Sequence, residues 1–530
     1  MESMWLCALG TGVFAHRTIF IKGEWHLHAP YVATTHLILW FVMIAITKSL
    51  SLPFILGTFY LTGLFSSIAV YRLFFHPLRH FPGPRGAALS KLWHVWHCWT
   101  SQNHILLDSL HKQYGDFVRI GPNGLAMFHP AALVVMDGGG NTNVPSEWYD
   151  IVYPRTSPIF SRNGVEHRDR RRSWDLALSG KAMNDYLPRI RNRVSSLLNV
   201  IADVKSTPIV LNDIVYSFAH DAASDFAFNE NFGMLESPTW HRIVAQQRSA
   251  LSLLGRLNSA IWLVRIGLVF FPFIPAVEAW KNLLDFCDTL AEKRLINEAT
   301  EPDILSYLIQ DLQQNSKNLS DKEKKNLLSG NAVTAMVGGS DTTGSGLTSI
   351  FYFLALHPHH ADKIYNELRH LSHPYDTHQL SKIAHLNGVI NESMRLLPAA
   401  LTAITRITGP EGLDIDDTFI PPNTKIGSPR YTVQRMESAF ANPLEFIPER
   451  WSTQPALIKD ARAFAPFGFG RRACVGKPLA LAQIRLVLAN VIDKFKFAFA
   501  PGVDVASVER DMKDYLTATP GKFSLVFEKR

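Results

Sequence analysis

The chain has 530 residues, of which 47% are hydrophobic and 19% charged, and its formal net charge at pH 7 is +7. This composition excludes a disordered chain, a collagen and a coiled coil, whereas the length allows about three domains or one large enzyme domain. The basic excess is mild and, apart from one short run, not clustered, so we expect a membrane surface or an acidic protein partner and no nucleic acid.

Residues 1–80 are predicted to form a membrane anchor. The segment 49–71 contains no charged residue, and about 20 consecutive apolar residues span a bilayer as a helix. A buried core helix is the alternative for this segment. Residues 31–47 are a second candidate span, and residues 5–15 are a shorter and weaker one. The main apolar segment lies too far from the start of the chain to be a cleaved signal peptide.

Basic residues flank the apolar segments on both sides: Arg17, Lys22, Arg72 and Arg79. Positive charge favours the cytosolic side of a membrane, so two spans would place both flanks and the following body in the cytosol. Residues 81–85 begin with Phe-Pro-Gly-Pro, which cannot continue a helix. We therefore predict a stiff hinge at 81–85 between the anchor and a catalytic body of 86–530.

The body is predicted to be one large, mostly α-helical domain with small β-sheets, and not a doubly wound sheet. Apolar residues recur at helical spacing in 185–202, 284–299, 331–356 and 479–495. Strand-like segments are short, at 117–120, 125–128 and 523–527. Residues 408–426 are rich in Pro, Gly and Asp, which favours short strands and turns.

Cys474 lies in a glycine-rich segment, 467–476, just before the helix predicted at 479–495. Glycine lets the backbone bend sharply and approach a flat ligand, and a helix N-terminus favours the thiolate that binds metals. Arg472 would neutralise an anionic group of a bound cofactor. A glycine-rich surface loop with an ordinary buried cysteine fits equally well. The four cysteines are far apart, so neither a disulfide framework nor a structural zinc site is expected.

The pattern F-x-x-G-x-R-x-C-x-G in this segment resembles the haem-binding signature of the cytochrome P450 family. Its fixed positions are Phe467, Gly470, Arg472, Cys474 and Gly476. The resemblance implies that Cys474 is the axial ligand of the haem iron and that the cofactor is held by Phe467, Gly468, Arg472 and Gly476. It covers essentially the whole chain, and the sequence from 71 to 84 looks like that of membrane-anchored fungal members.

Glu392 and Arg395 are spaced to lie on one face of a helix, where they can pair. In the family, this E-x-x-R pair binds the arginine of a P-E-R-F/W segment, which is present here as P-E-R-W with Arg450. The resemblance assigns all three residues to the structure around the haem. A buried glutamate between two arginines needs every hydrogen bond satisfied, since losing one member leaves a charge unpaired.

The segment Gly-Gly-Ser-Asp-Thr-Thr at 338–343 lies inside the long helical pattern. Its glycines and hydroxyls lower helix propensity, and a hydroxyl inside a helix can divert a hydrogen bond and open a local groove. A helix C-cap is the alternative, although the apolar pattern continues beyond it. The segment is similar to the oxygen-binding motif of the family, which implies that Asp341 and Thr342 deliver protons to dioxygen.

The run His-Arg-Asp-Arg-Arg-Arg at 167–172 is typical first of a solvated helix face or a partner-binding patch. The family has a W-x-x-x-R element that contacts the haem propionates. Alignment on Arg171 places His167 where Trp is usual, a departure that keeps an N–H donor. Arg406 resembles another propionate-binding arginine. Together with Arg472, these residues imply two or three cations for two carboxylates.

The resemblance implies a monooxygenase of the endoplasmic reticulum membrane that uses haem b, O2 and electrons from NADPH. Thiolate ligation favours O–O cleavage. Because no G-x-G-x-x-G fingerprint or flavin segment is present, the NADPH-cytochrome P450 reductase is expected to be a separate protein, with cytochrome b5 as an optional partner. We expect the reductase to dock on basic residues near Cys474: Arg471, Lys477 and 170–172.

The substrate pocket is specified weakly by the sequence. By family position, residues 399–403, 516–519 and 260–275 would line it, although the same residues fit an ordinary core. Their apolar and small hydroxylated character favours a lipophilic metabolite, such as a terpenoid or an indole alkaloid. A haem-thiolate isomerase or dehydratase without a reductase, and a non-catalytic membrane haem or lipid binder, are the alternative functions.

Overall fold

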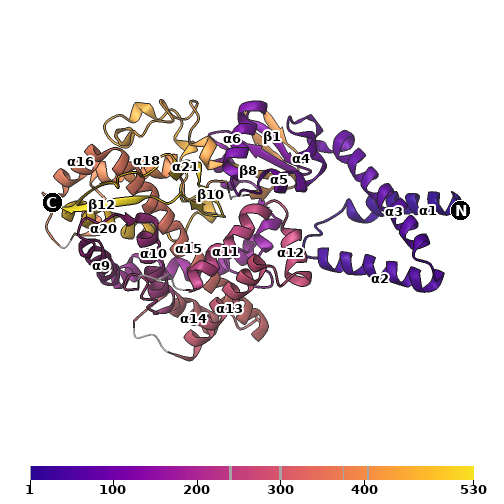
Figure 1. Ribbon diagram of the computed structural model, residues 1–530, viewed down its shortest axis with the longest axis horizontal. Coiled ribbons are helices and arrows are strands. Elements are labelled where there is room, and N and C mark those ends of the chain that lie inside the picture. The colour runs from indigo at the N-terminus through magenta and orange to yellow at the C-terminus, as the bar shows by residue number, and fades with distance from the viewer. Residues whose placement is uncertain (1, 238–241, 298–300, 374, 403–404) are drawn as a thin grey trace.

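A computed structural model describes residues 2–237, 242–297, 301–373, 375–402 and 405–530. Figure 1 shows helices α1, α2 and α3 projecting together from one side of a body that contains the rest of the chain. The N-terminus lies at the far end of this projection, and the C-terminus lies on the opposite side of the body. The apolar segments of the sequence are therefore set apart from the bulk of the chain.

The projection consists of three helices. They are α1 (Glu2–Ala15) with the π-helix η1 (His16–Phe20), α2 (Ala29–Thr47), and α3 (Ser51–Val70) with the π-helix η2 (Tyr71–Phe75). Among the described residues, Ala29–Thr47 and Ser51–Phe75 are helices long and apolar enough to cross a membrane. These two helices coincide with the predicted apolar segments 31–47 and 49–71. The weaker segment 5–15 lies in α1.

Helix α1 packs directly against the backbone of α3. A Cβ atom added at Gly12 would lie 2.1 Å from the carbonyl oxygen of Tyr60, and one added at Gly63 would lie 2.1 Å from that of Leu9. Small residues that let two backbones approach are typical of helix contacts within membranes. The two glycines therefore hold α1 on α3.

The segment between α1 and α2, residues 21–28, contacts the body, and we call it the junction loop. The Arg162 guanidinium donates to both carboxylate oxygens of Glu24, at 2.5 and 2.7 Å. It also donates to Asp150 at 2.9 Å, and His26 Nε2 lies 2.8 Å from the same Asp150 oxygen. A charged cluster thus connects the projecting helices to the body.

The segment predicted as a hinge lies against the first strand of the body. The Arg119 N–H donates to the carbonyl oxygen of Pro82 at 2.7 Å. The Arg119 guanidinium donates to the carbonyl oxygens of Arg72 at 3.0 Å and Pro122 at 2.7 Å. The chain leaving α3 is therefore fixed to the body through Arg119, whose side chain binds Arg72 before the proline-rich turn and whose backbone binds Pro82 within it.

The body is dominated by helices. They are α4 (Arg85–Leu89), α5 (Lys91–His97), α6 (Asn103–Tyr114), α7 (Ala132–Asp137), α8 (Gly164–Ala177), α9 (Gly180–Asp203), α10 (Leu211–Phe228), α11 (Arg242–Leu257), α12 (Ile261–Phe270), α13 (Pro275–Ile296), α14 (Ile304–Asn315), α15 (Asp321–Leu356), α16 (Pro358–Leu368), α17 (Thr377–Leu380), α18 (Ala384–Leu396), α19 (Arg430–Val433), α20 (Lys477–Lys494) and α21 (Ser507–Arg510). Short 3-10 turns are η3 (Pro77–His80), η4 (Glu147–Asp150), η5 (Pro448–Trp451), η6 (Pro455–Leu457), η7 (Ala461–Ala463) and η8 (Gly470–Arg472). The longest helix, α15, begins with a capping box between Ser320 and Glu323.

The strands form small sheets at the edge of the helical body. One sheet has the order β1-β2-β8-β5-β3, made of β1 (Phe117–Gly121), β2 (Gly124–Met127), β8 (Lys425–Gly427), β5 (Thr405–Ile407) and β3 (Val144–Pro145). A second has the order β4-β12-β9, made of β4 (Ile209–Val210), β12 (Ser524–Lys529) and β9 (Phe495–Phe499). Two hairpins pair β6 (Leu413–Ile415) with β7 (Thr418–Ile420), and β10 (Lys513–Asp514) with β11 (Ala518–Thr519).

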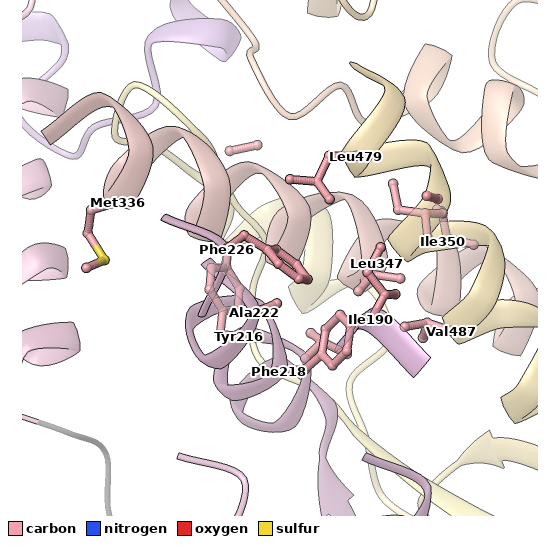
Figure 2. Close-up of a cluster of buried hydrophobic side chains, with 14 of the residues drawn as sticks. Ile190, Tyr216, Phe218, Ala222, Phe226, Met336, Leu347, Ile350, Leu479 and Val487 are labelled. Atoms are coloured by element: carbon pink, nitrogen blue, oxygen red, sulfur yellow. The ribbon is translucent and has the colours of Figure 1, made fainter. Parts of the chain in front are cut away.

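The main core surrounds α15. Figure 2 shows Phe218 and Phe226 of α10 reaching toward Leu347 and Ile350 of α15, with Val487 of α20 beside them. Each of these five side chains is at most 1% exposed. Burying an apolar side chain of this size contributes about 1.5–3 kcal/mol. The core therefore fixes α15 along its length, which positions the residues that it carries.

The predicted fold class is confirmed: the body is mostly α-helical with small sheets. The predicted strands 117–120, 125–128 and 523–527 coincide with β1, β2 and β12 to within a residue or two, and 408–426 contains β6 and β7. The helix predicted at 284–299 is longer than expected, because α13 begins at Pro275, a residue that fits the first turn of a helix. Helix α13 ends at Ile296, and residues 298 and 299 lie outside the described residues.

Candidate active site

Cys474 lies immediately before α20, as the sequence predicts. Its N–H donates to the carbonyl oxygen of Phe467 at 2.7 Å, which closes the glycine-containing loop. Burial raises the pKa of the Cys474 thiol, whereas hydrogen bonds from the backbone N–H groups of Gly476 and Lys477 and the charge of Arg171 lower it. The side chain is nevertheless exposed, so a ligand can reach its sulfur. Such N–H donors are suited to hold a thiolate that binds a cation.

Two neighbouring elements hold the cysteine loop in place. Gly470 has a φ of 62°, a conformation that favours glycine, and an added Cβ atom would lie 2.3 Å from the carbonyl oxygen of Asp137 at the end of α7. From α8, the Arg171 guanidinium donates to the carbonyl oxygen of Ala473 at 2.8 Å and to Asp175 at 2.8 Å. The loop is therefore fixed on both sides of Cys474.

Basic side chains from separate elements gather beside this loop. They are His167 and Arg171 of α8, Arg406 of β5, Arg430 of α19 and Arg472 of η8. Arg406 donates to both oxygens of Asp137, at 2.6 and 3.1 Å, and to the hydroxyl of Tyr149 at 2.8 Å. Arg472 donates to the carbonyl oxygen of Ser161 at 2.9 Å. The structure thus brings together the four basic residues that the sequence assigned to propionates and adds Arg430.

Burial and the neighbouring positive charges lower the pKa values of members of this group. Burial, followed by the charge of Arg406, lowers the pKa of Arg472 to about 10. Burial, followed by the charges of Arg472 and Arg171, lowers the pKa of His167 to about 4. Within the described residues, the carboxylates hydrogen-bonded to this group are Asp137, which binds Arg406, and Asp175, which binds Arg171, so the four arginines outnumber them. A buried excess of positive charge calls for an anionic ligand, so the cluster fits the two carboxylates of a haem.

Glu392, Arg395 and Arg450 form a fully buried ion-pair network. Glu392 Oε1 accepts from Arg395 Nη2 at 2.8 Å, from Arg450 Nε at 2.9 Å and from the N–H of Ile447 at 3.0 Å. Glu392 Oε2 accepts from Arg395 Nε at 3.0 Å and from the indole N–H of Trp451 at 2.9 Å. Both oxygens are therefore saturated by donors.

The two arginines also bind the backbone around them. Their remaining N–H groups donate to the carbonyl oxygens of Gln434, Pro443, Glu445, Ala441, Leu457 and Asn442. Arg395, Arg450 and Glu392 are each 0% exposed. Such a network is stabilising only while every member is present, because each charge lacks water as an alternative partner. It fixes α18 and η5 to the segment that leads to the cysteine loop.

Asp341 and Thr342 lie in the middle of α15. The Thr342 hydroxyl donates to the carbonyl oxygen of Gly338 at 2.7 Å, and its side chain is half-buried. Asp341 is buried, and its carboxylate accepts a short hydrogen bond from the Thr517 hydroxyl in the turn between β10 and β11. Burial raises the pKa of Asp341. The two side chains are adjacent in sequence but are bound to different partners.

Of the three segments predicted to line a substrate pocket, two lie beside or next to α15 and the third carries exposed aromatic residues. Residues 516–519 lie beside α15 through Thr517, and the Ala518 N–H donates to the carbonyl oxygen of Ala399 at 2.8 Å, so 399–402 lies next to them. Residue 403 lies outside the described residues. Within 260–275, Phe271 and Phe273 are 44% and 72% exposed. These aromatic residues therefore lie at the surface, which contradicts the prediction that they line a pocket.

Several residues of the site were missed from the sequence. They are Asp137, Tyr149, Arg430 and Trp451. Trp451 is part of the P-E-R-W segment, so its indole was a detectable candidate. The other three carry no local motif, because each reaches the site through tertiary packing. Thr517 lies in the range 516–519 predicted for the pocket, but its hydrogen bond to Asp341 was not predicted.

The arrangement defines a class of protein. A cysteine at a helix N-terminus, a buried excess of arginines and a long helix with an Asp-Thr pair are together suited to bind an anionic, metal-containing planar cofactor and to supply protons beside it. A buried glutamate with two arginines supports the cysteine loop. This combination is that of a haem-thiolate protein.

Comparison with known proteins gives the family. The cytochrome P450 family model matches residues 83–527, so the chain belongs to the cytochrome P450 family. It is 34% identical to the cytochrome P450 monooxygenase sthD of Phaeosphaeria nodorum, over 89% of this chain and 99% of that protein. It is 32% identical to tryprostatin B 6-hydroxylase of Aspergillus fumigatus, over 93% and 90% of the two chains.

A solved structure agrees with the fold. The crystal structure of the cytochrome P450DA heme domain superposes with a TM-score of 0.68 at 17% identity, covering 81% of this chain and 94% of that one. The predicted family and enzyme class are therefore confirmed: the chain is a cytochrome P450 monooxygenase. The family uses haem and O2 with electrons supplied by a reductase, and the fungal relatives belong to specialised metabolism.

Proposed function

We propose that this protein is a haem b monooxygenase, anchored in the endoplasmic reticulum membrane with its body in the cytosol, that oxidises a lipophilic small molecule in specialised metabolism. Electrons come from NADPH through a separate reductase, with cytochrome b5 as an optional partner. The observation that carries the proposal is the exposed thiol of Cys474 at the N-terminus of α20 beside a buried excess of arginines.

In this proposal the cysteine loop and the basic cluster hold the cofactor. When bound, the haem supplies one-electron and oxygen-activating chemistry. Cys474 would bind the iron through its thiolate, which the N–H groups of Gly476 and Lys477 would stabilise. Arg472, Arg171 and His167 would hold the propionates. Arg406 would contribute together with Asp137, which already neutralises part of its charge.

Asp341 and Thr342 are proposed to transfer the proton that the reaction requires. Burial raises the pKa of Asp341, which favours the protonated carboxyl that a donor needs. The Thr342 hydroxyl donates to Gly338, so its lone pairs remain to accept a hydrogen bond from a group in the site. Because Thr517 binds the Asp341 carboxylate, the side chain must exchange this partner to pass its proton on.

The substrate proposal rests on the character of the site and on the relatives. Residues 516–519 lie beside α15 and are small, apolar or hydroxylated. One relative is named for the 6-hydroxylation of tryprostatin B, a small-molecule substrate. We therefore propose a lipophilic terpenoid or alkaloid-like substrate and hydroxylation as the reaction.

The decisive experiment compares Cys474→Ser with wild type in microsomes that contain a reductase. The reduced, carbon-monoxide-bound wild type should show the red-shifted Soret band for which the family is named, and Cys474→Ser should lose it. Cys7→Ser is the matched control, since Cys7 is an exposed thiol in α1. Retention of the band by Cys474→Ser would refute the ligand assignment. Turnover of a panel of lipophilic metabolites with NADPH would then separate a monooxygenase from an isomerase or a non-catalytic binder.

A further inference from the structure

Away from the active site, three potential metal ligands meet where α16, α18 and η5 pack together. They are His360, His385 and Glu449, and their ligand atoms all lie within 4.8 Å of one another. His360 Nδ1 is 2.9 Å from His385 Nε2 and 3.9 Å from Glu449 Oε1. The histidines are 4% and 8% exposed, and the Glu449 side chain is 20% exposed.

The spacing of these atoms is close to that of a zinc site. Zinc binds imidazole nitrogen and carboxylate oxygen at about 2.0–2.2 Å in tetrahedral geometry, so two ligand atoms are about 3.3 Å apart. The distances of 2.9 and 3.9 Å from His360 Nδ1 lie on either side of this value. Small side-chain rotations therefore suffice to place all three ligands around one ion. Two histidines and a glutamate are also an established zinc ligand set that leaves a fourth position for water.

The contact between the two histidines supplies one unprotonated ligand nitrogen, and a tautomer change that moves the proton to the other nitrogen of the donor ring supplies the second. A hydrogen bond between two imidazole nitrogens requires that one of them carry no proton. An unprotonated imidazole nitrogen is the commonest metal ligand in proteins. His360 and His385 face each other in this way inside the protein, where neither the haem site nor the Glu392 network uses them.

A lysine now neutralises the carboxylate. Lys363 Nζ donates to Glu449 Oε1 at 2.6 Å, and the Lys363 side chain is 51% exposed. Because lysine is a flexible point charge at the surface, it can move into solvent when a stronger cation reaches the carboxylate. Lys363 is therefore a competitor of the metal and not part of its site.

A second cluster of potential metal ligands differs in the cation that binds its carboxylates. Glu24, His26 and Asp150 also place their ligand atoms close together. However, the Arg162 guanidinium binds both carboxylates, at 2.5 to 2.9 Å, and arginine remains charged. A fixed cation already occupies that cluster. At the His360 cluster the competing cation is a mobile lysine.

We propose that His360, His385 and Glu449 form a site for a divalent transition-metal ion, with zinc as the preferred ion. The ion would connect α16 to α18, which carries Glu392 and Arg395, and to η5, which carries Arg450 next to Glu449. Zinc would thus stabilise the elements that support the cysteine loop. This site is independent of the proposed catalytic function, because its ligands do not contact the cofactor residues.

The test measures zinc binding by the full-length protein in detergent after treatment with a chelator. Zinc is titrated in competition with a chromophoric chelator, and the thermal unfolding midpoint is followed by circular dichroism with and without zinc. Wild type should bind zinc and unfold at a higher temperature with it. His360→Gln and Glu449→Gln should weaken this binding by about tenfold or more. Magnesium, which prefers oxygen ligands, should neither bind nor stabilise.

Two further variants make the test specific. His359→Gln removes an exposed neighbouring histidine and should leave binding unchanged. Lys363→Gln removes the competing charge and should tighten zinc binding severalfold, a result that a purely structural role of the cluster does not predict. If His360→Gln and Glu449→Gln do not fold, Lys363→Gln still decides, since its side chain is half exposed. Unchanged or weaker zinc binding in Lys363→Gln, or wild-type binding in His360→Gln, would overturn the proposal.

Discussion

Glu392→Gln is the sharpest test of how the scaffold of the cysteine loop is stabilised. The substitution keeps the shape of the side chain and removes its charge. Glu392 Oε1 faces three donors and Oε2 faces two, from Arg395 and Trp451. A glutamine amide can present its oxygen to only one of these groups. The best orientation keeps the three bonds at Oε1 and turns the NH2 group toward the N–H donors of Arg395 and Trp451.

The magnitude follows from this geometry. Two buried donors lose their acceptor, at about 1–3 kcal/mol each and more for the charged one. Arg395 and Arg450 also lose their only carboxylate partner in the described residues while both remain 0% exposed. Removing one member of a buried ion pair costs about 3–5 kcal/mol. We therefore expect Glu392→Gln to lower the free energy of unfolding by about 3–5 kcal/mol, a large part of the 5–15 kcal/mol that is usual.

The assay is the loss of the reduced carbon-monoxide band with urea, together with the haem content of purified protein. Trp451→Phe is the matched control, because it removes one neutral donor of the five and leaves the glutamate charged, at about 1–2 kcal/mol. We expect the urea midpoint to be highest for wild type, slightly lower for Trp451→Phe and much lower for Glu392→Gln. Equal midpoints for the two variants would refute the reasoning, because the charge of Glu392 would then contribute no more than one hydrogen bond.

Three further predictions concern other parts of the molecule. Thr342→Ala should keep the haem but lower the coupling, the product formed per NADPH, by roughly tenfold. The control Thr348→Ala loses the same kind of hydrogen bond to a helix carbonyl and should leave the coupling unchanged. Equal coupling in the two variants would show that Thr342 takes no part in proton transfer. Burial raises the pKa of Asp514 from 3.8 to about 6. The contribution of its protonated carboxyl to the free energy of unfolding is therefore fully present below about pH 4 and is lost as the pH rises through about 6. Asp514→Asn should therefore narrow the difference in thermal midpoint between pH 5 and pH 7, and an unchanged difference would show that Asp514 is not its source. Arg162→Gln should speed tryptic cleavage in the junction loop about fivefold, since partly exposed ion pairs contribute about 1 kcal/mol. The control Arg168→Gln replaces an exposed arginine of α8, six residues further along the chain, and should leave the cleavage rate unchanged. Equal rates in the two variants would show that the cluster does not hold the loop.

The parts of the molecule that a single sequence could predict are those with local signals. Helix α15 follows from its apolar spacing, and the position of Cys474 before α20 follows from the glycine loop and the apolar run after it. The contact of Glu392 with Arg450 joins residues 58 positions apart. It was predictable only because a family resemblance linked two short motifs that are common by chance.

The parts that could not be predicted depend on tertiary contacts without a motif. Asp137 meets Arg406 across 269 positions, and Thr517 meets Asp341 across 176. No periodicity or composition relates such residues. The aromatic segment around Phe271 and Phe273 shows the opposite error: its apolar character suggested a pocket, but the structure places it on the surface. Apolar residues in a chain that carries helices apolar enough to cross a membrane are thus weaker evidence for burial.

The basic cluster beside Cys474 links stability to cofactor loading. Arg430 is buried and Arg472 half-buried, burial lowers the pKa of each to about 10, and His167 is held to a pKa of about 4, so gathering these groups has a free-energy cost. Within the described residues the cluster is offset by two carboxylates, Asp137, which is paired with Arg406, and Asp175, which is paired with Arg171. A ligand that binds only the folded state stabilises it, and one with two carboxylates does so most where cations are unpaired. The proposed propionate-binding arginines therefore make the fold itself depend on the haem, and the Glu392 network keeps the cysteine loop in place while that charge is neutralised.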